Sequence, residues 1–207
     1  MQQYEQYKDS GIDWIGQIPA HWEVKRLKNV ISQLIIKEQS INSSLMYIGM
    51  ENIESWTGKY ILTESTVEGL ANRFYKGNIL FGKLRPYLAK VFLAENEGIC
   101  STEFMVFDAR ENNENYIQKL LISSDFISIV NASTYGSKMP RASVEFINNT
   151  FLPLPPLAEQ TAIAEYLDNV NEKIERAIAL KREEIEKLKE YKQTLINSAV
   201  TGKIKIA

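Results

Sequence analysis

The sequence predicts an α+β fold in which a globular mixed α/β domain is followed by one long helix. Three observations support this prediction. Short strand-like apolar runs recur through the first part of the chain, three prolines lie within residues 153–156, and no further proline or glycine occurs until Gly202. Proline restricts its neighbours to extended backbone, whereas a stretch without proline or glycine is compatible with a helix. The chain is therefore expected to divide into residues 1–156 and 157–207.

The first part contains signals of both strands and helices. Strand-like apolar runs lie at residues 46–50, 78–84, 88–94 and 104–109. Residues 115–133 show apolar residues at helical spacing, which predicts a helix. Together with short turns at Gly77 and Gly98, these elements indicate a compact twisted sheet with helices.

The predicted helix at 157–200 has an apolar stripe about 100° wide at 100° per residue. Lys181 and Lys192 interrupt the stripe, and about 44 residues at about 1.5 Å each would reach about 66 Å. Such a helix would project beyond its domain, so its stripe is expected to pair with a second helix. An alternative is a hairpin folded back on the domain, although no glycine or proline offers a turn. The residues expected to form the dimer interface are Ile163, Leu167, Val170, Ile174, Ile178, Ile185, Leu188 and Leu195.

On other faces of this helix, two acid-first pairs are spaced for ion pairing between successive turns. These are Glu172 with Arg176 and Glu183 with Lys187. Gly202 follows the last helical residue and is expected to end the helix.

Composition argues against several classes of protein. No apolar run is long enough to span a bilayer and the N-terminus lacks a secretory pattern, so we expect a cytoplasmic protein without a membrane partner. Cys100 is the single cysteine and His21 the single histidine, which excludes an intrachain disulfide, His/Cys metal sites and Ser–His or Cys–His pairs. Neither a glycine-rich phosphate loop nor the proline motif of an adenine methyltransferase is present. We expect no catalytic residue, no metal and no cofactor.

Positive charge is segregated along the chain although its net charge is −2. Residues 69–94 contain five basic residues and no acid, and residues 24–37 contain four basic residues and no acid. A third acid-free window, residues 126–144, includes Lys138 and Arg141. These windows are expected to form one positive face suited to phosphates. The alternative is solvated surface charge distributed by chance.

Two loops supply the candidate contacts to DNA. "FGKLRPYLAK" (81–90) offers lysine and arginine for phosphates, and arginine can also read guanine in the major groove. In "YGSKMPRASVEF" (135–146), Gly136 and Pro140 fix the backbone around further donors. Alternatives are that Arg85 pairs with Glu103 and that the aromatic residues only pack. The expected DNA-binding residues are Lys83, Arg85, Tyr87, Lys90, Thr134, Tyr135, Ser137, Lys138 and Arg141.

Six stretches spread in order over nearly the whole chain carry a family resemblance. They are "YKDSGIDWIGQIPAHWEVKRLK" (7–28), "GNILFGKLRPYLAK" (77–90), "STEF" (101–104), "GSKMPRASVEF" (136–146), "LPLPPLAEQTAIAEYLD" (152–168) and "AVTGKI" (199–204). Together they resemble the specificity subunit of type I restriction–modification systems. Residues 38–76 match no part of the pattern, as expected where target preference varies.

The resemblance implies a non-catalytic subunit with a target-recognition domain at 1–156 and a conserved spacer helix at 157–207. Its partners would be double-stranded DNA, methyltransferase subunits and, through them, restriction subunits. A usual member has two recognition domains and two spacer helices packed antiparallel, whereas this chain has one of each. The resemblance therefore implies a homodimer joined by an antiparallel coiled coil that reads an inverted bipartite site. An assembly adaptor with negligible DNA binding of its own, and an orphan enzyme, stay open as alternatives.

Overall fold

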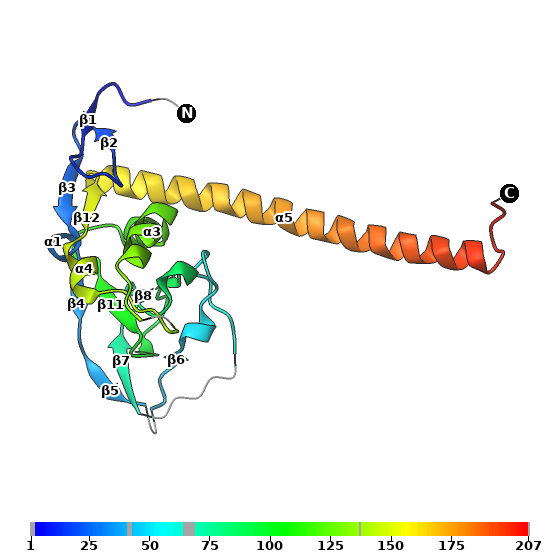
Figure 1. The fold of residues 1–207 in the computed structure, drawn as a ribbon, viewed down its shortest axis with the longest axis horizontal. Helices are drawn as coiled ribbons and strands as arrows, with labels where there is room; N and C mark the ends of the chain where they lie inside the picture. The colour runs from blue at the N-terminus through cyan, green and yellow to red at the C-terminus, as the bar shows by residue number, and fades with distance from the viewer. Residues whose placement is uncertain (1–2, 41–42, 64–68, 137, 207) are drawn as a thin grey trace. The chain divides into compact units, whose positions relative to one another are not determined.

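The computed structural model describes residues 3–40, 43–63, 69–136 and 138–206, which belong to two compact units, Met1–Ala164 and Glu165–Ala207. Figure 1 shows the elements along the chain. The strands are β1 (Tyr7–Asp9), β2 (Gln17–Pro19), β3 (Glu23–Arg26), β4 (Ser32–Leu34), β5 (Lys37–Gln39), β6 (Tyr47–Ile48), β7 (Leu70–Phe74), β8 (Ile79–Gly82), β9 (Val91–Leu93), β10 (Gly98–Cys100), β11 (Phe104–Asp108) and β12 (Phe151–Leu154). The helices are α1 (Leu27–Val30), η1 (Met50–Asn52), η2 (Pro86–Leu88), α2 (Glu114–Ile122), α3 (Ser124–Ala132), α4 (Val144–Asn149) and α5 (Leu157–Val200).

Two four-stranded sheets form the middle of the first unit. One has the order β4-β11-β8-β9 and the other β5-β7-β10-β6. In the first sheet, Leu80 and Val106 pack toward residues of the second sheet, whereas Phe81 and Phe107 join the core formed with α2 and α3. Because successive side chains of a strand point to opposite faces, this sheet is the middle layer between helices and the second sheet.

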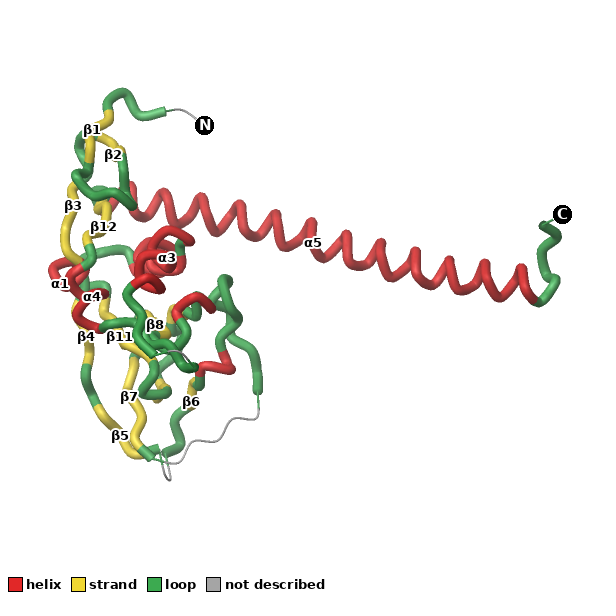
Figure 2. The backbone as a smooth tube through the Cα atoms, in the orientation of Figure 1, coloured by secondary structure: helices red, strands yellow, loops and turns green. Residues whose placement is uncertain are grey.

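The strand segments predicted from sequence are confirmed, because each contains one of the strands β6, β8, β9 and β11. The pairing of β12 with β3, which joins Pro153 to Val24, was not predicted. Proline has no amide hydrogen to donate to a ladder, and it is tolerated here in a small two-stranded sheet. Figure 2 shows these strands and the helices that accompany them.

The single helix predicted at 115–133 is wrong, since the segment forms two helices that meet at Ser123. Ser123 has extended backbone (φ −61°, ψ 147°), and its hydroxyl donates to the Leu120 carbonyl at 2.8 Å. In one continuous helix, Phe126 would lie about 180° from Ile117 around the axis. The break turns both residues into the same core, where each is fully buried.

Helix α5 starts and stops as predicted. Gly202 takes the left-handed conformation at φ 71°. Its N–H donates to Ala199 (3.2 Å) and the N–H of Lys203 donates to Ser198 (2.8 Å). These are the two hydrogen bonds of a Schellman motif, which satisfies carbonyls at a helix end.

Both predicted ion pairs of α5 are present, Glu172 with Arg176 and Glu183 with Lys187. No helix among the described residues is both long and apolar enough to cross a membrane.

The first two turns of α5 belong to the first unit and are held there by polar side chains. Gln160, 2% exposed, accepts from the Asn113 N–H (2.9 Å) and donates to the Pro155 carbonyl (2.9 Å) and to Asn112 (3.1 Å). Ala164, one turn later, is buried in the main core. The helix therefore starts from a fixed point of the domain.

Candidate nucleic-acid interface

Three loops that are separate in sequence meet at the end of the β8–β9 hairpin. The Arg85 N–H donates to the Pro140 carbonyl (2.7 Å), and the Ala142 N–H donates to the Lys83 carbonyl (2.9 Å). The Lys83 N–H in turn donates to the Glu103 carbonyl (3.0 Å). Loops 83–90, 101–103 and 134–142, called the interface loops from here on, are thus joined by backbone hydrogen bonds. They include both loops that the sequence indicated for DNA contact.

The short helix η2 inside the first interface loop lies between two residues in the left-handed conformation. Arg85 precedes it at φ 50° and Ala89 follows it at φ 46°. Residues with a Cβ rarely adopt this conformation, and such outliers cluster at functional sites. The geometry fixes how the segment between them, with the exposed Tyr87, is presented. Neither residue type signals this conformation in the sequence.

Arg141 connects two of the interface loops through its side chain. Its Nε and Nη2 contact both carboxylate oxygens of Glu103 at 2.7–3.2 Å. This hydrogen-bonded ion pair raises the pKa of Arg141. The backbone of Arg141 also exchanges two 3.1 Å hydrogen bonds with Tyr135. The sequence left open an ion pair between Arg85 and Glu103. In the structure, Glu103 forms its ion pair with Arg141 instead.

Three other predicted cations lie on the interface loops. Within the described residues, the side chains of Lys83, Arg85 and Lys138 form no hydrogen bond or ion pair. Arg85 and Lys138 are exposed and Lys83 is half-buried, and the exposed Tyr87 and Tyr135 lie on the same loops. These groups are available to phosphates and bases, which suits nucleic-acid binding.

The remaining predicted residues have other surroundings. Lys90 is half-buried, and its ammonium donates to the Met50 carbonyl at 2.6 Å. Burial lowers the pKa of Lys90, and Glu51 opposes that shift. The Thr134 hydroxyl donates to the Asn131 carbonyl (2.8 Å) at the end of α3. Ser137 lies outside the described residues.

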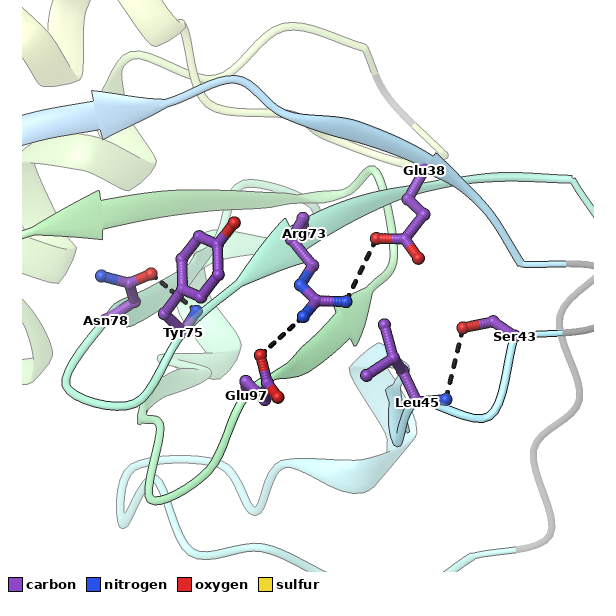
Figure 3. A network of polar contacts seen from close by, with 7 residues as sticks. All are labelled: Glu38, Ser43, Leu45, Arg73, Tyr75, Asn78 and Glu97. Carbon is purple, nitrogen blue, oxygen red and sulfur yellow. Dashed lines mark hydrogen bonds and ion pairs between the residues drawn. The ribbon is translucent and has the colours of Figure 1, made fainter.

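Arg73 shows why a basic window in the sequence is not the same as a basic surface. Figure 3 shows this β7 residue between Glu38 and Glu97, with Nη1 to Glu38 at 3.2 Å and Nη2 to Glu97 at 2.6 Å. The guanidinium also lies 5.4 Å from the centroid of the Tyr75 ring. Arg73 came from the same acid-free window as Arg85, but its carboxylate partners come from outside that window. The positive charge of Arg73 is therefore balanced by ion pairs within the protein.

One segment beside the interface loops was missed by sequence reasoning. Residues 54–59 pack against the β9 end of the first interface loop, where the Trp56 N–H donates to the Ala89 carbonyl at 3.2 Å. The tryptophan is 51% exposed at φ 67°. This segment falls in the range that matched no family stretch. The one signal in the sequence was a tryptophan placed directly before Thr-Gly.

The apolar stripe of α5 is the second candidate site. Ile163 packs partly against the main core of the first unit, so the exposed stripe starts at Leu167. Val170 is half-buried. The other predicted stripe residues are 41–60% exposed: Ile174, Ile178, Ile185, Leu188 and Leu195. The second unit is a single helix with a short tail, so nothing within that unit covers the stripe.

Metal-ligating side chains are not clustered in the parts of the chain that the structure describes, where no three His, Cys, Asp or Glu residues gather to hold an ion. The single histidine, His21, has its Nε2 2.5 Å from Glu159. Cys100 is fully buried in the core between the two sheets.

The first unit is a layered domain that presents charged loops, and the second unit is a long helix with an apolar stripe. The comparison with protein families specifies the family of the chain. Residues 19–190 match the type I restriction modification DNA specificity domain. The chain belongs to this family, and its expected fold class, α+β with a long C-terminal helix, is confirmed.

Three of the proteins that the chain matches are about twice its length or somewhat more. The specificity subunit of the type I restriction enzyme EcoDI from Escherichia coli is 24% identical over 177 residues, covering 80% of this chain and 40% of that protein. The crystal structure of the HsdS subunit from Thermoanaerobacter tengcongensis matches with a TM-score of 0.66 and 26% identity, over 86% of this chain and 49% of that one.

A second solved structure concerns complex assembly and conformational transition of the type I R-M system. It matches with a TM-score of 0.69 and 27% identity, again over 86% of this chain and 49% of that one. This chain therefore spans about half the length of the relatives it matches.

Proposed function

We propose that the chain is a half-length specificity subunit that reads double-stranded DNA through the interface loops. The observation that carries this proposal is the joining of three loops by backbone hydrogen bonds, with Lys83, Arg85 and Lys138 left without protein partners among the described residues. These backbone bonds hold the loops that carry the cations in place before DNA arrives, so less backbone entropy is lost on binding. Lys83 and Lys138 would contact phosphates, and Arg85 a phosphate or a guanine edge.

We further propose that two copies pair through the exposed stripe of α5 as an antiparallel coiled coil. Support comes from the row of exposed apolar residues on a single helix. A two-fold dimer would place two identical domains in inverted orientation, so the DNA site would consist of two inverted half-sites. The coiled coil would then set the length of the unread spacer.

The family points to the remaining partners. The relatives are named as subunits of type I restriction enzymes, and one solved structure concerns assembly of the type I system. We propose that this chain also works in such an assembly in the cytoplasm. It would be non-catalytic, and methyltransferase subunits and, through them, restriction subunits would supply the chemistry.

The DNA-binding proposal is tested by fluorescence anisotropy with a duplex enriched from a random-sequence library, for the chain alone and with its methyltransferase subunit. Replacing both Lys83 and Arg85 by Glu is expected to weaken binding about 100-fold or more. With alanine instead, the salt dependence of log K should fall by about one for each phosphate that the protein no longer neutralises. Lys76→Glu is the matched control for Lys83→Glu alone, because each replaces one lysine and this exposed lysine precedes β8 whereas the interface loops follow it.

Three results would contradict parts of this proposal. Equal weakening by Lys76→Glu would mean that the effect is general charge repulsion. Absence of binding by the chain alone, with normal co-purification of the methyltransferase subunit, would support an assembly adaptor. Tight binding of S-adenosylmethionine to the isolated chain would point to an enzyme.

A further inference from the structure

Trp56 lies at the tip of a tight loop whose backbone is strongly constrained. Ile53 and Tyr60 form an antiparallel bridge at its base. Within the loop, the Glu54 N–H donates to the Lys59 carbonyl at 2.8 Å. The Thr57 hydroxyl donates to the Glu54 carboxylate at 2.6 Å. The loop therefore presents its tip residue in one conformation.

The backbone at Trp56 has the conformation that glycine favours. Trp56 and Gly58 both have φ 67°, a left-handed value at which a bulky side chain is strained. At Gly58 the reason for glycine is visible, because a Cβ there would lie 2.2 Å from the Val91 carbonyl oxygen. At position 58 the chain thus has glycine, the residue that the left-handed conformation favours. At position 56 it keeps the largest side chain instead, which indicates that this side chain has a use other than packing.

Exposure distinguishes Trp56 from the other two tryptophans. The Trp14 ring meets the Phe126 ring edge-on at 6.1 Å between centroids, and the Trp22 indole donates to Glu159 at 3.0 Å. Trp56 is 51% exposed, and its indole N–H has no hydrogen-bond partner among the described residues. An aromatic ring that presents both an apolar face and a free donor is suited to an interface.

The loop around Trp56 is attached to the interface loops at a defined point. The Trp56 N–H donates to the carbonyl of Ala89, the residue that follows η2, and Arg85 precedes η2 on the other side. Trp56 and Arg85 are therefore both held by the same short element, and Tyr87 lies inside it. The two residues thus belong to segments joined at η2, which also carries the exposed Tyr87.

We propose that Trp56 packs its indole against base edges of the bound duplex and supplies part of the sequence discrimination of this domain. The inference rests on the proposed function and adds a specificity-determining residue that lies outside the six stretches carrying the family resemblance. An apolar contact with a base edge distinguishes bases, for example through the thymine methyl group, whereas a phosphate contact does not.

The experiment compares affinity for the enriched duplex with affinity for a scrambled duplex of the same composition. Trp56→Ala is expected to reduce the ratio of the two affinities about tenfold or more while leaving scrambled binding nearly unchanged. Trp56→Phe should restore much of the ratio, and Lys83→Ala should weaken both affinities alike. Binding of the enriched duplex should also change the tryptophan emission of the wild type but not that of Trp56→Phe.

Folding of the variants is checked by circular dichroism and melting temperature. If Trp56→Ala is unfolded, Trp56→Asn replaces it, because asparagine tolerates the left-handed conformation. An unchanged affinity ratio in a folded variant would overturn the assignment while leaving the proposed function intact. So would a variant with normal site preference that no longer binds the methyltransferase subunit, which would place Trp56 at a protein interface. A wild type without any site preference would instead remove the proposed function itself.

Discussion

The two parts of helix α5 differ in the kind of residue that determines their surroundings. In the first two turns, Glu159 and Gln160 form hydrogen bonds to groups of the first unit, and Ala164 is buried in its core. From Leu167 onward, the stripe consists of aliphatic side chains, and charged residues pair with one another along the helix. One part is specified by directed polar contacts, and the other presents apolar surface without a covering element of its own unit.

This difference indicates two separate roles for one continuous helix. Directed hydrogen bonds define a position, so the first turns fix where the helix leaves the domain. Apolar surface drives association without direction, and the register of a helix pair then depends on side-chain packing. The two roles should therefore be separable by mutation, with substitutions in one part leaving the other unaffected.

The largest effect is expected in the stripe. Leu188→Asp places a charge on the proposed seam and should convert a particle of about twice 23.7 kDa into one copy, as measured by light scattering. Thermal unfolding of the first unit should be unchanged, because Leu188 belongs to the second unit.

The same substitution at Leu180 is the matched control for this prediction. Leu180 is 67% exposed, similar to the 60% of Leu188, but lies about 80° from it around the helix and outside the predicted stripe. Leu180→Asp should leave the mass unchanged. A wild-type chain that is monomeric at tens of micromolar would contradict the pairing proposal before any variant is made.

A smaller effect is expected at the start of the helix. Gln160→Ala leaves the Asn113 N–H and the Pro155 carbonyl without their partner in a buried place. The free energy of unfolding should fall by about 2–4 kcal/mol, which lowers the melting temperature by roughly 5–15 °C. Gln193→Ala, an exposed change on the same helix, should cost less than about 0.5 kcal/mol.

Thiol labelling gives an independent measurement of this second prediction. Burial raises the pKa of Cys100 to about 12, so its thiol stays protonated and reacts with a disulfide reagent only when the first unit opens. Gln160→Ala should accelerate labelling at pH 8, whereas Leu188→Asp should not. Acceleration by Leu188→Asp would show that the two parts of α5 are not independent.

The sequence predicted those parts of the structure that depend on residues close to one another along the chain. Helix α5 and its end at Gly202 were predictable because the absence of proline and glycine and the spacing of apolar residues are local features. The break at Ser123 was not predictable. Nothing local distinguishes Ser123, where the first helix ends, from Ser124, where the second begins, and the burial of Phe126 depends on core residues that are distant in sequence. Arg73 and Arg85 likewise looked equivalent. Glu38 and Glu97 form ion pairs with Arg73, and the folding of the second sheet brings them to it.

The smallest effect concerns the protonation of Glu159. Burial by itself would raise the pKa of this carboxyl, but hydrogen bonds from Trp22, His21 and Tyr4 outweigh it and lower the pKa below the ordinary 4.5. A carboxyl with a lowered pKa in the folded state stabilises that state above its unfolded-state pKa, and the stabilisation is lost as the pH falls through the folded-state pKa.

Wild type should therefore exceed Glu159→Gln in stability by up to about 1 kcal/mol at pH 6, and the difference should shrink toward pH 4 and below. Urea denaturation at several pH values, followed by tryptophan fluorescence, measures this difference in the free energy of unfolding. The mass by light scattering should be the same for both proteins at each pH, since Glu159 lies in the first two turns. A difference that grows as the pH falls would mean that the Glu159 hydrogen bonds do not stabilise the start of the helix, and the comparison between the two parts of α5 would then rest on Gln160 alone.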